Sequence, residues 1–180
     1  MQTFVALLRG INVGKANRIP MAELRALLAD QGYSDVATLL NSGNAIFRAS
    51  NGSSSKHAEA ISTAILGKFN LQVPVIVKSA KELAEIIREN PINTSVANHS
   101  QLLVAFVQES NALLGLGSIA SLVALPEQFI AGKGAAYMHC ANGILESKAA
   151  KALLGKAGKA TTTRNWATVL KLQTLADASS

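Results

Sequence analysis

The chain has 180 residues, of which 49% are hydrophobic, and this is enough apolar material to bury the core of one large or two small domains. A single cysteine, Cys140, excludes an internal disulfide, and no apolar run approaches the ~18 residues of a membrane-spanning helix. The first ten residues lack the features of a signal peptide, so we expect a cytoplasmic protein with no membrane partner.

The net charge of +6 is concentrated near the C-terminus. Residues 130–180 carry seven basic against two acidic side chains, whereas residues 1–129 carry ten against nine. This basic segment is either the solvated surface of helices or a face that meets anionic partners.

Residues 1–90 alternate strands and helices in the order β-α-β-β-α-β, which is typical of a ferredoxin-like unit. Thr3 to Leu8 is a continuous apolar run, which predicts a central strand that is covered on both faces. Pro74 cannot donate to a strand ladder, so the last strand is expected at a sheet edge. The other expected elements are a helix from Pro20 to Gly32, a hairpin of 36–40 with 45–47, and a helix over 58–69.

A second lobe is expected after a polar, turn-rich boundary at residues 90–100, which divides the chain into lobes at 1–90 and 91–180. Ser79 and Glu82 form a capping-box pattern, which predicts a third helix that ends before Asn90. Further on, the pattern predicts a strand over 102–107, a helix over 112–122, a hairpin of 128–131 with 136–140, and helices over 147–156 and 164–176. This order repeats the first lobe with its last strand replaced by a helix.

The expected fold class is therefore α+β. It consists of two ferredoxin-like lobes whose antiparallel sheets carry packed helices, with a pseudo-duplication of the first lobe in the second.

Five blocks of the sequence carry a resemblance to a known family. They are ALLRGINVGKANRIPMAELRALL, TLLNSGNAIF, VPVIVKS, ESKAAKAL and TTTRNWATVLKL. In order and spacing they resemble the bacterial family called domain of unknown function 1697, over nearly the whole chain. The resemblance implies two ferredoxin-like lobes in a bacterial cytoplasmic protein, and it implies no substrate.

The loop after the first strand indicates an anion-binding site. We expect strands one and three to run parallel, so that both helices of the first lobe begin at one end of the sheet and direct free N–H groups there. The same end then carries four cations and two asparagines that orient a ligand: Arg9, Lys15, Arg18, Arg48, Asn12 and Asn17. The alternative is that the arginines pair with surface acids and the glycines only serve turns. The loop is not a P-loop, since Arg9 and Ala16 replace residues that the motif requires.

The SGN turn is expected at the opposite end of the sheet from Arg9. It is either a plain positive-φ turn or part of a cleft between the lobes. The cleft candidates of the sequence are Asn41, Ser42, Asn44, Lys148 and Trp166.

The TTRNW block has two interpretations as well. Thr162 or Thr163 is expected to cap the last helix, with Arg164 and Asn165 in its first turn as further ligand-binding candidates. Trp166 either belongs to the core stripe of that helix or stacks on a nucleobase.

The spacing of histidines and carboxylates in the sequence does not predict a metal site or an acid–base pair. His57, His99 and His139 fall in different elements, and no carboxylate pair is placed for general acid–base work, so we expect no metal site and no cofactor. The leading hypothesis is a binder of a phosphorylated small molecule, a nucleotide or RNA. The alternatives are an enzyme acting on an anionic small molecule in a cleft between the lobes, and an oligomeric scaffold whose edge strands pair.

Overall fold

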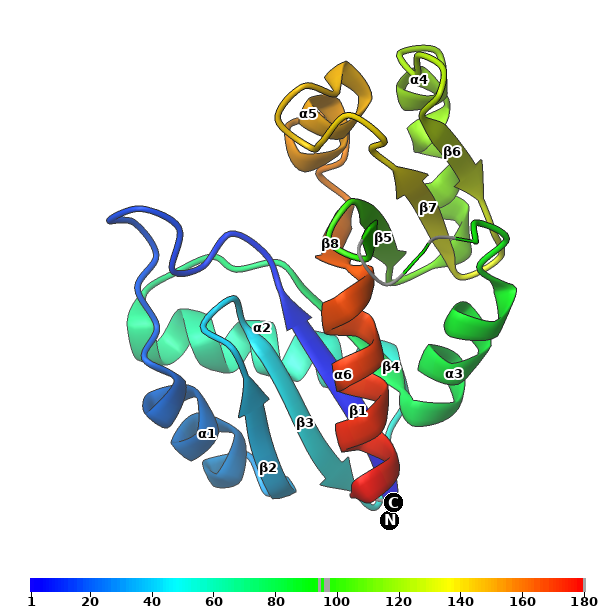
Figure 1. Ribbon diagram of the computed structural model, residues 1–180. Helices are drawn as coiled ribbons and strands as arrows, with labels where there is room; N and C mark the ends of the chain where they lie inside the picture. Colours follow the sequence, from blue (N-terminus) through cyan, green and yellow to red (C-terminus); the bar gives the residue numbers. More distant parts are fainter. Residues whose placement is uncertain (94, 96–97, 180) are drawn as a thin grey trace. The chain divides into compact units, whose positions relative to one another are not determined.

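The chain folds into two four-stranded antiparallel sheets with helices packed on them, and it is an α+β protein (Figure 1). The computed structural model describes residues 1–93, 95 and 98–179. One compact unit comprises Met1–Leu83 together with the chain from Leu172 onward, and the other comprises Ala84–Lys171. This division differs from the expected lobes at 1–90 and 91–180, because a piece of helix changes unit at each boundary.

The elements of the first unit follow the predicted order. They are β1 (Gln2–Leu8), α1 (Met21–Asp30), β2 (Ser34–Leu39), β3 (Asn44–Ala49), α2 (Ser54–Phe69) and β4 (Val75–Ser79). Pro20 is the N-cap residue of α1 rather than its first helical residue, and its carbonyl oxygen accepts from the Leu24 N–H at 3.0 Å. α3 (Ala80–Glu89) follows β4 without a break.

The first sheet has the strand order β2-β3-β1-β4, which is that of a ferredoxin-like unit. β1 is an inner strand, and its residues from Thr3 to Leu8 are all buried, as the apolar run predicts. Because side chains alternate along a strand, Phe4, Ala6 and Leu8 share one face, and they join the core formed with α1 and α2. β4 is an edge strand that begins directly after the proline, which confirms that prediction.

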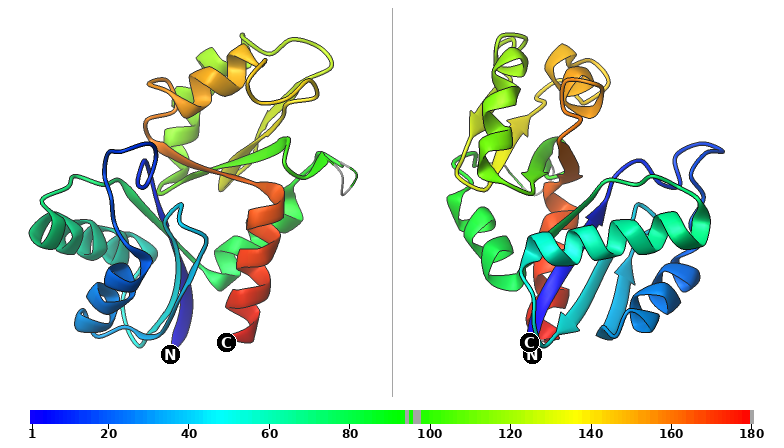
Figure 2. Two further views of the ribbon diagram at one scale, coloured as in Figure 1. Left: turned by 60° about the vertical axis from the view of Figure 1, so that its left-hand side comes forward. Right: turned by 180° about the vertical axis from the view of Figure 1, so that it is seen from behind.

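The other face of β1 is covered by the C-terminal end of α6 (Trp166–Ala178). Leu172 and Ala176 are 0% and 1% exposed, and the Thr3 Oγ1 hydroxyl donates to the Ser179 carbonyl oxygen at 3.1 Å. Figure 2 shows the first sheet between α1 and α2 on one side and this end of α6 on the other. The helix end therefore removes Val5 and Leu7 from water, at about 25 cal/mol per Å² of apolar surface.

The second unit has the strand order β6-β7-β5-β8, which repeats that of the first. Its elements are β5 (Leu102–Val107), the 3-10 helix η2 (Ser110–Leu116), α4 (Gly117–Ala120), β6 (Gln128–Ala131), β7 (Ala135–His139), α5 (Lys148–Leu154) and β8 (Thr161–Asn165). The helix expected over 112–122 is only partly α-helical, because Gly115 and Gly117 weaken an α-helix. Within the described residues, no helix is long and apolar enough to cross a bilayer.

Residues 161–165 form a strand where the sequence analysis placed a helix cap. β8 pairs antiparallel with β5, with Phe106 opposite Thr162 and Val104 opposite Arg164. The prediction of a last strand replaced by a helix was therefore wrong. Three consecutive β-branched threonines favour a strand, and pairing with β5 decides between this signal and the capping pattern.

The second half of α3 belongs to the second unit. The Tyr137 hydroxyl donates to the Ile86 carbonyl oxygen at 2.6 Å, and Lys133 Nζ lies 3.9 Å from Glu89 Oε1. Burial, with a smaller contribution from the charge of Glu89, raises the pKa of Tyr137 to about 12. α3 follows the last strand of the first sheet, but its second half belongs to the second unit. Likewise, α6 follows the last strand of the second sheet, but its C-terminal end belongs to the first unit.

The predicted capping box is present at the start of α3. The Ser79 N–H donates to Glu82 Oε2 at 2.7 Å, and the Glu82 N–H donates back to Ser79 Oγ at 3.2 Å. Ser54 Oγ donates to the same carboxylate at 2.6 Å, and Lys78 Nζ lies 3.9 Å from its other oxygen. Burial alone would raise the pKa of Glu82, but these hydrogen bonds and the lysine charge outweigh burial and lower it. One carboxylate thus ties the starts of α2 and α3 together.

We expect Glu82→Ala to lower the free energy of unfolding by about 1 kcal/mol at pH 7, because a partly exposed cap is screened by solvent. A carboxylate with a lowered pKa stabilises the fold above its unfolded-state pKa and ceases to do so as the pH falls through its folded-state pKa. The difference from the wild type should therefore shrink on acidification below pH 4.5. Urea unfolding at several pH values measures this difference in the free energy of unfolding, with the exposed Glu59→Ala as the control. A difference that is independent of pH would contradict this account.

Candidate functional site

The pairing of β1 with β3 determines which loops of the first unit lie together. The two strands are antiparallel, with Leu7 opposite Asn44 and Gln2 opposite Ala49. The expectation that the first and third strands run parallel was wrong. β3 lies between β2 and β1 and runs antiparallel to both, so β2 is the strand parallel to β1. The helices α1 and α2 therefore begin at opposite ends of the sheet, and the SGN turn lies at the Arg9 end.

Arg48 does not join the other three cations. It lies opposite Thr3, at the far end of β1, and its Nη1 is 3.5 Å from Asp35 Oδ2. The predicted cluster of four cations around two helix starts is thus not formed. What is left at the other end is the loop from Arg9 to Pro20.

The SGN turn is hydrogen-bonded to the last residue of β1 and to this loop. The Leu8 N–H donates to the Gly43 carbonyl oxygen at 2.8 Å, and Asn12 Nδ2 donates to the Asn41 carbonyl oxygen at 2.8 Å. We call the Arg9–Pro20 loop and the Leu40–Gly43 turn together the loop–turn site. The two blocks that carry the family resemblance most specifically, LRGINVG and SGN, therefore meet in one place.

Asn12 organises the inside of the loop. Its Oδ1 accepts from the Ile19 N–H at 2.9 Å, and its Nδ2 also donates to the Ile19 carbonyl oxygen at 2.9 Å. Asn17 Nδ2 donates to the Gly10 carbonyl oxygen at 3.1 Å. Both asparagines adopt positive φ, which asparagine tolerates better than most residues. Their amide groups bond to the backbone of the loop, whereas their predicted role was to orient a ligand.

Gly43 is the point of closest approach between the turn and the loop. It adopts φ +82°, and a Cβ there would lie 2.7 Å from Leu8 Cβ and 2.8 Å from Ile11 Cδ1. Asn44 is fully buried, and its Nδ2 donates to the Leu39 carbonyl oxygen and to Ser42 Oγ. The polar side chains of the SGN block thus build the turn itself.

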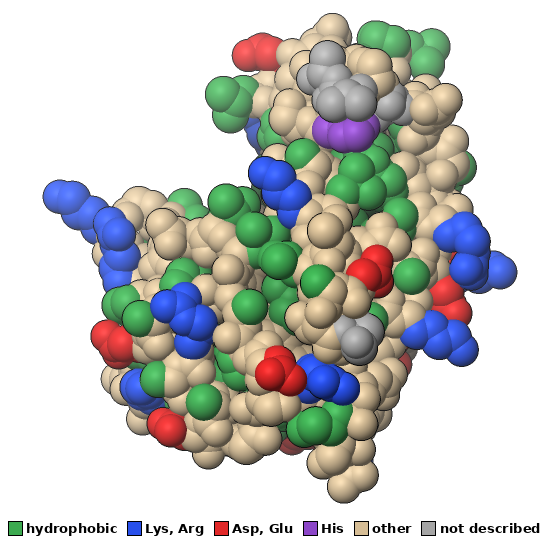
Figure 3. All heavy atoms as spheres, turned by 60° about the horizontal axis from the view of Figure 1, so that its bottom comes forward, with side chains coloured by type: hydrophobic (Ala, Val, Ile, Leu, Met, Phe, Trp, Pro, Cys, Tyr) green, Lys and Arg blue, Asp and Glu red, His purple; other side chains and the backbone are tan. Residues whose placement is uncertain are grey.

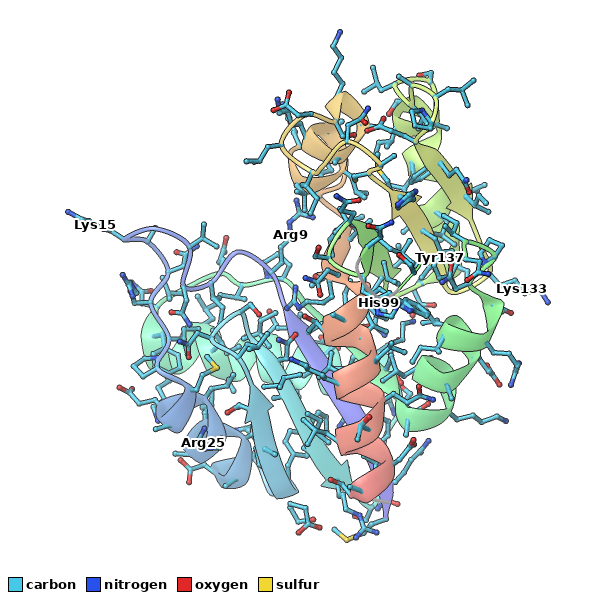
Figure 4. The ribbon with its side chains drawn as sticks, viewed as in Figure 1. Arg9, Lys15, Arg25, His99, Lys133 and Tyr137 are labelled. Carbon is cyan, nitrogen blue, oxygen red and sulfur yellow. The ribbon has the colours of Figure 1, made fainter. Side chains whose placement is uncertain are left out.

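The cations of the loop differ in their surroundings. Lys15 and Arg18 are exposed, and within the described part of the chain neither has a carboxylate at ion-pair distance. Figure 4 shows Lys15 at the tip of the loop, extended into solvent. Arg9 is half-buried at the base of the loop, and this burial lowers the pKa of its guanidinium. Figure 3 shows that basic side chains are scattered over the face it draws rather than gathered in one patch.

The candidates of the second unit lie on β8, α5 and the start of α6. Burial lowers the pKa of Arg164 to about 10, and its Nη1 donates to the Thr163 carbonyl oxygen at 2.9 Å. Asn165 caps α6, since its Oδ1 accepts from the Thr168 N–H at 2.9 Å. Trp166 is half-buried as the first residue of α6, and Lys148 is exposed as the first residue of α5.

The buried stripe of α6 is formed by Val169, Leu172 and Ala176. Trp166 and Leu170 are only half-buried, so Trp166 does not belong to this fully buried stripe.

The described titratable residues include no converging group of metal ligands and no cysteine with a lowered pKa. Among the described residues, no group of three or more metal-ligating side chains converges. Cys140 is fully buried, and burial with the nearby Glu127 raises the pKa of its thiol to about 11. His57 packs edge-on against Phe4 and Phe47, and burial lowers the pKa of its imidazole.

One cleft was not anticipated by the sequence analysis. It has a volume of about 450 Å³ and lies between α2 and the extended segment that precedes β4. It is lined by Ser62, Thr63, Leu66, Gln72, Val73 and Pro74. Val73 and Pro74 open the VPVIVKS block, but the sequence does not bring them together with Ser62, Thr63 and Leu66, because the cleft arises from the packing of two segments.

Comparison with known sequences identifies the family. The sequence model of the family described as "protein of unknown function (DUF1697)" matches residues 1–137. The chain belongs to this family. The DUF1697 match includes both blocks of the loop–turn site, while the blocks at 146–153 and 161–172 lie beyond it. No functionally curated protein matches the chain.

A solved structure has the same fold as this DUF1697 protein. It is a conserved bacterial protein from Streptococcus pneumoniae, with 24% sequence identity and a TM-score of 0.81. The similarity covers 97% of this chain and 98% of that one. At this identity it establishes the shared architecture of the two chains, and no activity follows from it.

We expect Gly43→Ala to destabilise the protein by more than about 2 kcal/mol, since it adds a steric contact to the cost of a positive φ. Gly14→Ala is the matched control, because Gly14 adopts φ +60° with nothing within 4 Å of its would-be Cβ. Urea unfolding of the two variants separates the contact from the backbone strain. Equal losses would show that the close approach of Gly43 to Leu8 and Ile11 carries no energy.

We expect Asn12→Asp to loosen the loop selectively. The carboxylate can still accept from Ile19, but it loses the bonds donated to Ile19 and Asn41, at a cost of about 1–3 kcal/mol. Hydrogen exchange should show lost protection at the Asn12 amide, whose N–H donates across the loop to the Asn17 carbonyl oxygen at 3.0 Å. The exposed Asn111→Asp serves as the control. Unchanged protection at the Asn12 amide would contradict the role of the Asn12 side chain.

Proposed function

We propose that the protein binds a phosphorylated ligand, a nucleotide or RNA, at the loop–turn site. In this proposal Lys15 and Arg18 contact phosphate groups, and Arg9 adds charge at the base of the loop. Asn12, Asn17 and the SGN turn hold the loop in shape. The observation that carries the proposal is a loop internally fixed by hydrogen bonds that presents two exposed cations.

Pre-organisation is the physical reason why this arrangement favours binding. A loop that is already ordered loses little conformational entropy when a ligand arrives, so more of the electrostatic attraction becomes affinity. The loop also leads into α1, whose N-cap Pro20 makes no side-chain capping bond to the first turn. The backbone N–H groups of that turn can therefore donate to an anion.

Stacking of bases on the first sheet is disfavoured. Phe4 and Phe47 are the aromatic residues of β1 and β3, and they are 2% and 0% exposed. Their rings lie 5.6 Å apart in the core under α1 and α2. An RNA would thus be held through its phosphates and not through exposed sheet aromatics.

We expect a fluorescently labelled single-stranded RNA to bind with an affinity that falls as salt rises. Lys15→Gln with Arg18→Gln should weaken binding and reduce the slope of log K against log[salt] by about 1.4, since each phosphate contact to a single strand contributes about 0.7. Fluorescence polarisation across a salt series measures this slope.

The matched control is Lys56→Gln with Lys68→Gln, which removes the same charge from α2. If both double variants weaken RNA binding equally, the binding depends only on the net charge of the protein, and the assignment of the loop–turn site is overturned. Absent or salt-independent binding would overturn the phosphate-binding function with RNA as ligand. The enzyme alternative stays a prediction.

A further inference from the structure

The cleft beside α2 has the size and the chemistry of a small-molecule site. Its volume of about 450 Å³ falls within the ~300–1,000 Å³ of typical ligand pockets. None of its six lining residues is charged. The cleft thus offers no counter-charge to an ion, and an uncharged part of a ligand is the better match to it.

The polar groups of the cleft can recognise a molecule with both donors and acceptors on its edge. Ser62 Oγ donates to the Val73 carbonyl oxygen at 3.0 Å, so its lone pairs are directed to further donors. The Thr63 hydroxyl and the Gln72 amide can each donate and accept. A glutamine amide matches the donor and acceptor pair of a nucleobase edge.

The remaining lining is apolar. Leu66 is 43% exposed although it is a large hydrophobic residue, and Pro74 is also exposed. These two side chains offer apolar contact to the faces of a flat ring. A neutral heteroaromatic ring has this combination of apolar faces and a hydrogen-bonding edge.

The cleft adjoins the start of the loop–turn site. The Arg9 N–H donates to the carbonyl oxygen of Pro74 at 2.9 Å, so the cationic loop leaves the sheet from the rim of the cleft. Figure 1 and both views of Figure 2 show the Arg9–Pro20 loop and the segment before β4 at the same end of the first sheet. A neutral cleft next to a cationic loop suits a ligand with a neutral ring and a phosphate.

We propose that this cleft is a nucleoside-binding site, which receives the base and ribose of a nucleotide. The proposal rests on the proposed function for the phosphate only; the cleft itself is assigned from its own lining. Thr63 and Gln72 hydrogen-bond the base edge, and Leu66 with Pro74 packs on its face. The phosphate then lies toward the Arg9–Pro20 loop.

Amide chemical shifts of the full-length ¹⁵N-labelled protein test the two parts separately. The four common ribonucleosides, ribose 5-phosphate and the four nucleoside monophosphates are the probes. We expect at least one nucleoside to shift the signals of Thr63 and Gln72, and ribose 5-phosphate to shift those of Lys15 and Arg18. The corresponding monophosphate should shift both sets and bind at least about tenfold more tightly than the nucleoside, because two contacts then act in one molecule.

Variants of an exposed residue keep the test interpretable. Thr63→Trp fills the cleft from the helix surface and should abolish the nucleoside shifts while it leaves the ribose 5-phosphate shifts unchanged. Thr63→Ser keeps the hydroxyl and should bind as the wild type does. A well-dispersed spectrum shows that each variant is folded.

The possible failures are distinct. If no ribonucleoside shifts the cleft signals, or if Thr63→Trp binds nucleosides like the wild type, the nucleoside site is overturned. If nucleosides bind at the cleft but no phosphate probe shifts the loop signals, the cleft stands and the phosphate-binding function falls. If a nucleoside and an RNA oligonucleotide shift the cleft signals but no monophosphate does, the site stands with an RNA nucleotide as its source.

Discussion

The antiparallel pairing of β1 with β3 is the constraint on which the candidate site depends. Because Leu7 lies opposite Asn44, the turn before β3 meets the loop after β1, and Gly43 packs against Ile11 without room for a Cβ. The same register carries Arg48 to the other end of the sheet, where it meets Asp35. The pairing of β1 with β3 thus brings the two parts of the loop–turn site together and separates Arg48 from the other three cations of the expected cluster.

Within that site, structural and binding roles fall to different residue types. The asparagine amides bond to backbone atoms of the loop, and asparagine and glycine adopt the positive φ values that the loop requires. Lysine and arginine remain at the surface, where a long charged side chain loses little by staying hydrated. The LRGINVG and SGN blocks are therefore explained first as one folding unit, and their ligand contacts would come from the basic residues between them.

Both faces of each sheet need a cover, and the chain supplies it across the boundary expected at residue 90. Thr3 bonds to Ser179, and Tyr137 bonds to Ile86, so the end of α6 completes the first unit and the end of α3 completes the second. The apolar run from Thr3 to Leu8 already predicted a strand covered on both faces. The apolar run could not predict which helix covers the strand, because the apolar face of a helix does not specify the sheet on which that helix packs.

The sequence by itself determined the elements whose signals are local. Apolar runs marked β1 and β5, Pro74 marked the edge strand, and Ser79 with Glu82 marked the start of α3. Where two local signals competed, as in the threonines of β8, pairing with β5 decided the outcome. Only the tertiary structure decided that Asn12 reaches Asn41, that Arg48 lies apart, and that Ser62 and Pro74 line one cleft. Such contacts join residues distant in the chain, and their formation depends on strand direction and packing, which no single segment specifies.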